Sequence, residues 1–161
     1  MSKLLERAGD PVQVPGATRF VLGEKQLRAA NIDSVGPTFK CVFLGKVEEN
    51  VGQASLVGDT LTKSSKDVSI IAELGERLES SLVHMLAIIR KQKGGWMGIL
   101  WTIGRGNVFY IQGKDKKLWP IRVRWLRGCE CWDVEAFSLD DPRGWPSGDR
   151  IFSRATVPQA L

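Results

Sequence analysis

The chain has 161 residues, of which 43% are hydrophobic and 25% charged, and its 23 Lys and Arg against 18 Asp and Glu give a formal charge of +5. These values are typical of one globular domain and exclude a wholly disordered chain. No apolar run approaches the ~20 residues of a membrane-spanning helix, and the first ten residues lack the pattern of a signal peptide, so we expect no membrane partner. The three cysteines, an odd number, fit a reducing compartment, and we expect a cytoplasmic protein.

The small number of histidine and cysteine residues restricts the catalytic and metal sites that the chain can form. His84 is the only histidine, so a Ser-His-Asp or Cys-His catalytic site would have to use it. A four-ligand zinc site would need His84 together with Cys41, Cys129 and Cys131, which lie in three distant segments. No phosphate-binding glycine loop, zinc-protease motif or calcium loop occurs. We therefore expect no cofactor and no metal, and we interpret His84 as a half-exposed residue of its helix.

Proline and glycine are frequent in the first 37 residues, which contain one short apolar patch, Phe20-Val21-Leu22. This composition predicts a loosely attached N-terminal arm over 1–37, with one strand near 18–22. We expect the remainder, 38–161, to form a single α+β domain with a helical part over 38–93 and a β-meander over 97–153.

The segment 38–51 has two interpretations. Apolar residues recur every four positions from Phe39 to Val51, between Pro37 and Gly52, which favours a helix. The run 39–44 also fits a β-strand, and Gly45 would cost a helix about 1 kcal/mol relative to alanine. We favour the helix.

The clearest helix is predicted over 76–92, after a turn-rich stretch (52–67) with a short helix near 54–61. Its apolar residues follow the i, i+3, i+4 spacing of one helix face, and Gly94-Gly95 ends it. We expect this face to cover a sheet, packing against Trp101 and Phe109. The residues predicted to be buried there are Leu78, Leu82, Met85 and Ile89.

From residue 97 the apolar period changes to two, which predicts strands. Hairpin partners must place like faces together, and this condition fixes a register for four strands. It pairs Trp101 with Phe109 and Ile103 with Asn107 across the turn 104–106, and Phe109 with Ile121 and Ile111 with Trp119 across the next turn. Across the third turn it pairs Val123 with Val134 and Trp125 with Trp132.

The other face of the last hairpin supports the same register independently. It places Arg124 opposite Asp133 and Arg122 opposite Glu135, so that opposite charges face each other. Residues 150–153 add a short edge strand. The predicted fold class is therefore α+β, with one or more helices packed on one face of an antiparallel four- to five-stranded C-terminal meander.

Several residues of the loops are candidates for contact with a partner. Residues 94–128 hold seven Lys and Arg against one Asp, and the cations outside the strands lie in hairpin loops. Trp145, in a Gly- and Pro-rich loop, either folds back over the sheet, which we favour, or stands exposed as an interface anchor. The candidate partner-binding residues are Trp145, Arg143, Arg105, Lys114, Lys116, Lys117 and Arg127.

Two further features have structural interpretations that we prefer. Cys129-Glu130-Cys131 is a CxC motif in a hairpin loop, and we expect Cys129 in the turn and Cys131 at the start of the strand, rather than a redox or metal site. Asp140, Asp141 and Asp149 flank the Trp145 loop, where turn capping explains them with fewer assumptions than a cation or a carboxylate-based active site.

No motif raises the chain above a globular α+β domain, so function is predicted only by class. We expect a small non-enzymatic module that binds a protein partner. The alternatives are a nucleic-acid-associated protein that uses the basic hairpin loops and, less favoured, a carboxylate-based enzyme.

Overall fold

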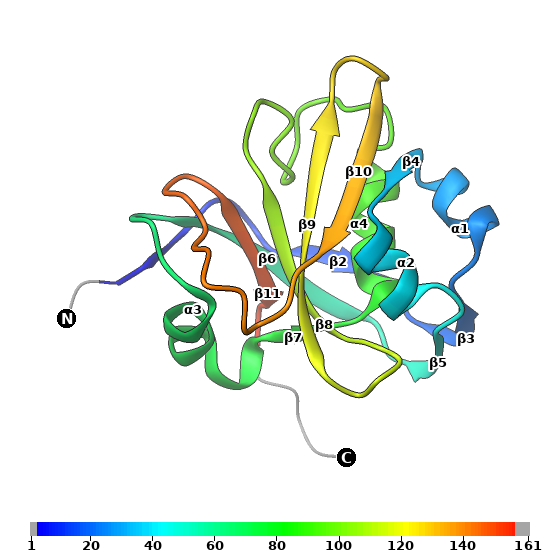
Figure 1. Ribbon diagram of the computed structural model, residues 1–161, viewed down its shortest axis with the longest axis horizontal. Coiled ribbons are helices and arrows are strands. Elements are labelled where there is room, and N and C mark those ends of the chain that lie inside the picture. The colour runs from blue at the N-terminus through cyan, green and yellow to red at the C-terminus, as the bar shows by residue number, and fades with distance from the viewer. Residues whose placement is uncertain (1–2, 157–161) are drawn as a thin grey trace.

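The computed structural model describes residues 3–156, and within that range one mixed sheet of nine strands forms the centre of the molecule (Figure 1). The strands are β1 (Leu5–Arg7), β2 (Val12–Val14), β3 (Ala17–Val21), β4 (Ile32–Val35), β5 (Val47–Val51), β6 (Ala54–Leu61), β7 (Glu79–Ser80), β8 (Asn107–Gln112), β9 (Leu118–Leu126), β10 (Cys131–Ala136) and β11 (Arg150–Arg154). The helices are α1 (Glu24–Ala29), α2 (Pro37–Phe43), α3 (Asp67–Leu74) and α4 (Leu82–Lys91), with a 3-10 turn at Gly75–Arg77.

The topology corrects the predicted fold class. The strand order is β1-β6-β11-β8-β9-β10-β4, with β2 also paired to β6 and β7 also paired to β8, while β3 and β5 form a separate two-stranded sheet. Three pairings are parallel, namely β11 with β8, β7 with β8, and β4 with β10. The meander is thus part of a larger mixed sheet, and β11 lies inside it rather than at its edge.

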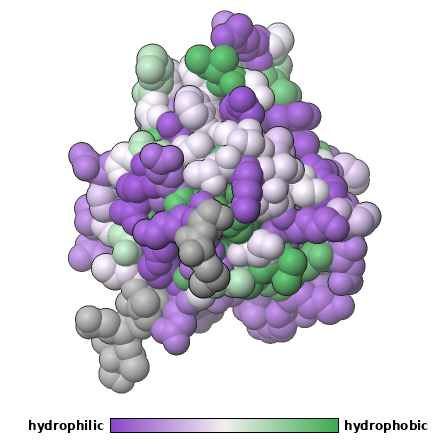
Figure 2. Space-filling view, turned by 90° about the vertical axis from the view of Figure 1, so that its left-hand side faces the viewer, coloured by the Kyte–Doolittle hydropathy of each residue, from purple (hydrophilic) through white to green (hydrophobic). Residues whose placement is uncertain are grey.

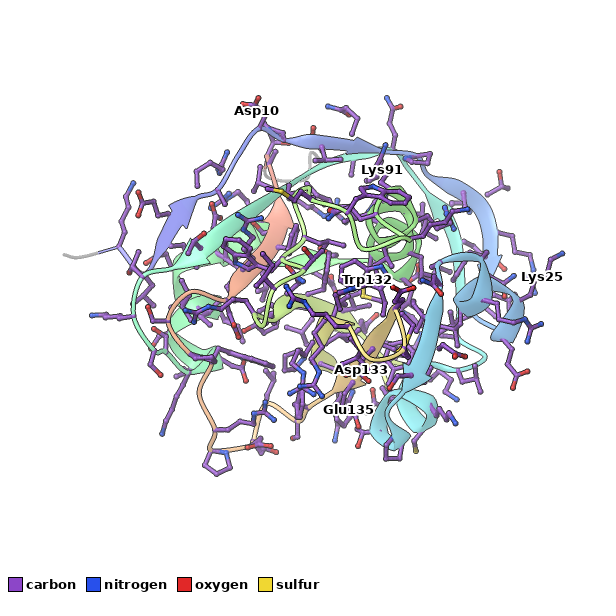
Figure 3. The ribbon with its side chains drawn as sticks, turned by 90° about the horizontal axis from the view of Figure 1, so that it is seen from above. Asp10, Lys25, Lys91, Trp132, Asp133 and Glu135 are labelled. Carbon is purple, nitrogen blue, oxygen red and sulfur yellow. A yellow bond between two sulfur atoms is a disulfide. The ribbon has the colours of Figure 1, made fainter. Side chains whose placement is uncertain are left out.

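The register of the last two hairpins agrees with the prediction. Phe109 pairs with Ile121 and Ile111 with Trp119 between β8 and β9. Between β9 and β10, Val123 pairs with Val134, and Arg124 lies opposite Asp133. Figure 3 shows Trp132 on the α4 side of β10 and Asp133 and Glu135 on the other side. The predicted alternation of the two faces is therefore confirmed here.

The first predicted strand, 98–103, is wrong. This segment is an irregular loop, although Ile99, Trp101 and Ile103 alternate as in a strand. Side chains, not a neighbouring strand, bind its backbone: the Asn107 side chain accepts a hydrogen bond from Trp101 N (2.8 Å) and donates one to Trp101 O (3.1 Å). Asn107 pairs with Val123 on one side and with Arg150 of β11 on the other, so no side is left for Ile103.

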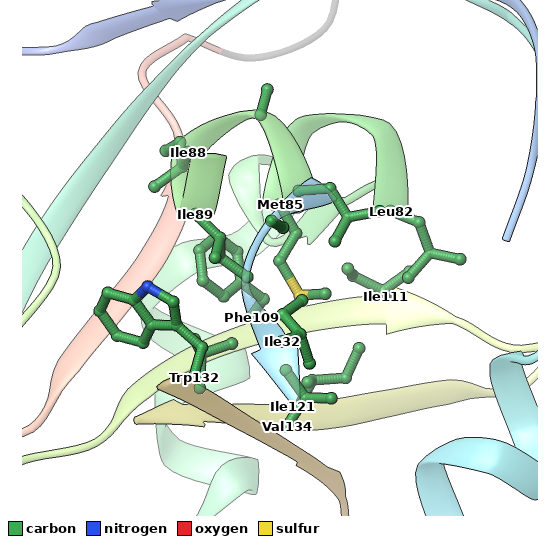
Figure 4. Close-up of a cluster of buried hydrophobic side chains, with 14 of the residues drawn as sticks. Ile32, Leu82, Met85, Ile88, Ile89, Phe109, Ile111, Ile121, Trp132 and Val134 are labelled. Atoms are coloured by element: carbon green, nitrogen blue, oxygen red, sulfur yellow. The ribbon is translucent and has the colours of Figure 1, made fainter. Parts of the chain in front are cut away.

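Both faces of the sheet are covered, which explains why β8 is buried at five successive positions. On one face α4 packs its apolar stripe against strands β8, β9 and β10, as Figure 4 shows for Leu82, Met85 and Ile89 beside Phe109. On the opposite face α3 covers a second cluster that contains Val108 and Tyr110. Leu78 belongs to this second cluster, so it does not pack on Phe109 with the other three residues.

The helix predicted over 76–92 begins later, at Leu82. Gly75 has a φ of +57°, which interrupts the helix, and Glu79 and Ser80 pair with β8 as a short parallel strand. Ser81 is the N-cap, because its hydroxyl accepts a hydrogen bond from the N–H of His84 (3.1 Å).

In the segment 38–51 the favoured helix is confirmed only for the first half, and the alternative strand over 39–44 is wrong. Its first half is α2, with Pro37 in the first turn, and its second half is β5. Gly45, with a φ of +87°, lies between them in a conformation that L side chains rarely adopt. The short helix expected near 54–61 is wrong, since these residues form β6, which makes three pairings in the described chain, with β1, β2 and β11.

Residues from 1–37 take part in both sheets. The expected strand near 18–22 is β3, which pairs with β5. In addition β1 and β2 pair with β6, and β4 pairs with β10. The division of the chain into an arm (1–37) and one domain (38–161) stays a prediction, although these strands of its first part are bonded to the second.

Candidate functional site

The loop between α4 and β8, residues 94–106, places apolar side chains in solvent. Met97 is 89% exposed, Ile103 60% and Trp96 54%. The loop lies at the upper end of the molecule in Figure 1, and hydrophobic side chains reach the surface beside hydrophilic ones at that end in Figure 2. Large apolar side chains exposed in one loop make that loop a candidate contact surface.

Side chains from three other positions hold the backbone of this loop. Buried Gln92 donates to the carbonyls of Trp96 (2.9 Å) and Leu100 (3.2 Å) and accepts from Leu100 N (2.8 Å). Arg150 donates to the carbonyl of Ile99 (2.6 Å) and stacks on the Trp101 ring. With the two Asn107 bonds described above, the backbone of 96–101 is fixed, Leu100 is buried in the core, and Trp96 and Met97 project outward.

The loop also packs on the end of the β9–β10 hairpin. Gly95, with a φ of +74°, lies so close to the Trp125 ring that a Cβ atom there would overlap it. The Asn31 side chain donates to the carbonyls of Lys93 (2.7 Å) and Glu130 (3.0 Å), which joins the end of α4 to the hairpin turn. The loop and the hairpin end therefore form one surface.

A disulfide between Cys129 and Cys131 closes this hairpin turn. Cys129 is exposed in the turn and buried Cys131 begins β10, as expected, but the bond between them was not expected. Cys41 is a free, exposed cysteine. The turn is thus held by a covalent link in addition to its strand pairing.

Four arginines line a pocket of about 370 Å³ beside the loop, and we call it the arginine pocket. Its walls come from the loop end 104–106, from β9 and from the segment 143–149. Residues of three chain segments thus meet there. The four arginines are Arg105, Arg122, Arg124 and Arg143.

Arg122 lacks the acidic partner that its cross-strand position predicts. Glu135 lies opposite it in the register but turns toward α2, where its carboxylate accepts a hydrogen bond from Phe39 N (2.9 Å). Arg122 instead reaches only Asp133, at 3.9 Å, and Asp133 is already bound by Arg124 at 3.1 Å. Burial, together with the neighbouring Arg124, lowers the pKa of Arg122, which reports a poorly compensated charge.

Arg143 and Arg105 are held by contacts other than ion pairs. The guanidinium of Arg143 stacks on Phe137, 3.7 Å from the ring centroid, and Arg105 donates to the carbonyl of Ser147. Of the six ion pairs in residues 3–156, none involves either arginine. Their charges are thus available to a ligand.

The carboxylate of the pocket is that of Asp149, which is buried. It accepts a hydrogen bond from Gly106 N (3.0 Å). Burial raises the pKa of Asp149, while that bond and three arginines, Arg105 first, oppose the rise. Asp149 and Asp133, which pairs with Arg124 and lies 3.9 Å from Arg122, set two carboxylates against four guanidinium groups, so the pocket keeps a net positive charge.

Trp145 borders the pocket with its backbone segment but its ring is inside the protein, only 1% exposed. Its indole N–H donates to Asp67 (2.8 Å), which also accepts from the Tyr110 hydroxyl (2.6 Å). The favoured interpretation, that Trp145 folds back, is confirmed. Its indole ring therefore offers no exposed anchor.

The other predicted partner-binding residues are divided between the two ends of β9. Lys114, Lys116 and Lys117 lie in the β8–β9 turn, at the lower end of the molecule in Figure 1, where Lys114 donates to the carbonyl of Leu44 (2.7 Å). Arg127 lies exposed in the β9–β10 turn at the upper end. The structure brings Arg105, Arg143 and Trp145 together in one place but separates the lysines from them.

The remaining candidate groups are engaged in structure. Asp141 accepts from Arg143 N (3.0 Å), as expected of a turn residue, and Asp140 N donates to Ser138. His84 is buried rather than half-exposed, because all sides of this part of α4 are covered. In residues 3–156 no group of three or more His, Cys, Asp or Glu side chains could hold a metal ion, and no helix there has the length and hydropathy to cross a membrane.

Comparisons of the chain with protein-family models, curated proteins and solved structures return no match. Function must therefore be inferred from the chemistry of the site. Our sequence analysis missed Arg122 and Arg124 as site residues because it assigned both to acidic partners. It missed Trp96 and Met97 altogether, although their position between Gly94-Gly95 and Gly98 is a loop signal.

Proposed function

We propose that this protein is a non-enzymatic module that binds a protein partner through the 94–106 loop. The observation that carries the proposal is the fixed backbone of a loop whose side chains Trp96, Met97 and Ile103 stand in solvent. A loop that is already ordered loses little conformational entropy when it binds. Burial of its apolar side chains then contributes to affinity rather than to folding.

The composition of this end of the molecule supports a protein partner. Tryptophan, methionine and arginine are enriched in protein interfaces and lysine is depleted. Here Trp96 and Met97 lie in the loop and Arg105 at its end, with Arg124 and Arg127 on the adjoining hairpin. The indole N–H of Trp96 already donates to the carbonyl of Lys91 (2.9 Å), so the ring can be buried without leaving this donor unpaired. The expected partner surface has an apolar recess next to acidic groups.

The experiment places a photo-crosslinking amino acid at position 97 and exposes the protein to lysate from its source, with and without nuclease. We expect a protein adduct that survives nuclease and is lost when Trp96→Ala and Ile103→Ala are combined. Position 68 is the matched control, because Val68 is 73% exposed but belongs to α3. An adduct that forms equally from position 68, or that disappears with nuclease, contradicts the proposal.

The alternative function is nucleic-acid binding through the basic hairpin turns. The same protein can be used to test it. Binding to phosphates weakens steeply with salt, by ~0.7–0.9 log units per decade of salt for each contact. If wild-type protein shifts short single-stranded DNA or RNA at about 0.15 M salt and the Lys114, Lys116, Lys117→Ala variant does not, the alternative replaces our proposal. We expect the triple variant to leave capture of the protein partner intact, because rim charges contribute little to affinity.

A further inference from the structure

We propose that the arginine pocket is a binding site for an oxyanion, the phosphate or carboxylate group of a ligand or partner. The inference does not rest on the proposed function, because a small anion can enter the pocket whether or not the 94–106 loop binds a protein.

The first argument is charge. Four guanidinium groups line about 370 Å³ of space, and the described chain sets two carboxylates against them, Asp149 in the pocket and Asp133 beside Arg122 and Arg124. Like charges so close repel each other, and arginine stays protonated at every physiological pH. An anion between them removes the repulsion and gains attraction to each. The pocket is therefore complementary to a negative ligand and not to a neutral or cationic one.

The second argument is hydrogen bonding. The Nε of Arg122 is buried and has no hydrogen-bond partner among residues 3–156. Arg105 uses one side-chain nitrogen on Ser147, and Arg124 uses its Nε on Asp133, which leaves further N–H groups of both side chains unassigned. Guanidinium groups present parallel N–H donors in a plane, and this geometry matches the oxygens of carboxylate and phosphate.

The third argument is preorganisation. The guanidinium of Arg143 lies on the Phe137 ring at 3.7 Å from its centroid, and that of Arg122 lies 5.1 Å from the same ring. Gly106 fits between Asp149 and Arg122, where a Cβ atom would come within 3.2 Å of the Asp149 carboxylate. These contacts hold the side chains in place before a ligand arrives, which reduces the entropy lost on binding.

The probes are inorganic phosphate and malonate, titrated in the low-millimolar range with sodium chloride added to keep ionic strength constant, because salt alone screens the arginine cluster. Isothermal titration calorimetry gives the dissociation constant, and ¹H–¹⁵N spectra of the arginine Nε–H groups show which side chains respond. We expect saturable shifts of the Arg122 and Arg143 signals. Preference for phosphate or for malonate assigns the source of the oxyanion, and either one supports the site.

The variants are Arg105→Gln and Arg143→Gln, since neither residue forms an ion pair in the described chain and Arg122, half-buried, is a riskier change for folding. Each should weaken binding about tenfold or more, because a hydrogen bond to a charged group is lost. Arg28→Gln is the control: it removes the same charge from an exposed pair on α1 and should leave the dissociation constant unchanged.

Two results would overturn the proposal. In one, neither anion produces saturable shifts beyond those caused by chloride. In the other, Arg28→Gln weakens binding as much as Arg143→Gln does, which would indicate general charge attraction. Neither result touches the crosslink expected from position 97, so this inference and the proposed function fail separately.

Discussion

Buried Glu48 joins β5 to the start of α4 through side-chain hydrogen bonds. Its carboxylate accepts from the N–H groups of Leu82 (2.9 Å) and Val83 (3.0 Å) in the first turn of α4, and Lys46 pairs with it at 3.0 Å. A negative group at a helix N-terminus satisfies free N–H donors and the helix dipole together. The sequence contains no signal for this, because Glu48 belongs to a distant strand.

Replacement of Glu48 by alanine should therefore be costly. Glu48→Ala leaves the two N–H groups of α4 without their acceptor and Lys46 with only the carbonyl of Gln112, and we expect a loss of about 3 kcal/mol in the free energy of unfolding. Glu49→Ala is the control, since its pair with Arg19 is exposed and should contribute less than ~1 kcal/mol. Urea denaturation measures both, and equal losses would show that Glu48 does not hold α4.

His84 should make stability depend on pH. Its Nε2 lies 2.8 Å from the carbonyl of Gly52, so the neutral ring must donate there, and burial lowers the pKa of His84 from its ordinary value of about 6.5. The unfolded chain then takes up a proton first as the pH falls. Stability is full above pH ~6.5 and decreases as the pH falls from there toward the lower pKa of the folded protein.

The measurement is the free energy of unfolding of wild-type protein and His84→Gln across pH 7 to 5. As the pH falls, the free energy of unfolding of the wild-type protein should decrease more than that of His84→Gln. Asp149 acts in the opposite sense, because its pKa is raised, but it is present in both proteins and cancels. Parallel curves would mean that folding does not shift the pKa of His84.

Among the elements, α4 contributes more buried residues to the first core cluster than any other. Leu82 is fully buried in the cluster that includes Phe109 and Ile111. Leu82→Ala should cost roughly 2–5 kcal/mol through lost burial and the cavity that remains. Val68→Ala, on the exposed side of α3, is the matched control and should change the melting temperature by less than a degree or two. An equally small change for Leu82→Ala would contradict the packing of α4.

Elements whose partners are close along the chain could be predicted from the sequence. The β8–β9–β10 register follows from local hairpins, in which apolar residues such as Val123 and Val134 must share a face and Arg124 must meet Asp133. The strand 54–61 could not be recognised in this way, because its partners are β1, β2 and β11, from both ends of the described chain. Its composition, rich in Gly, Ser and Thr, resembles that of a turn.

The site could be predicted only in part, because it too depends on segments that are distant in the sequence. Arg105 and Arg143 were identified as loop cations, but their meeting depends on the path of 137–149 back over the sheet. Arg122 could not be identified, because only the structure shows Glu135 turned toward α2.

For the molecule as a whole, β11 connects two parts of the sheet, since it pairs with β6 on one side and β8 on the other. Phe152 of β11 is fully buried and stacks on Phe109 at 4.6 Å between ring centroids. Phe152→Ala should cost about 3–5 kcal/mol. Hydrogen exchange should then accelerate in β6 and β8 alike, whereas acceleration in only one of them would show that the two parts are stable separately.

This central place of β11 has a consequence for how the protein is made. On the ribosome, the strands from 5 to 61 and those from 107 to 136 can each begin to pair as they emerge. β6 and β8 cannot be joined to each other until residues 150–154 have left the exit tunnel, so both strands keep open edges that can bond to other chains. The sheet is completed only when β11 has been made, and nascent chains should need a chaperone's protection until then.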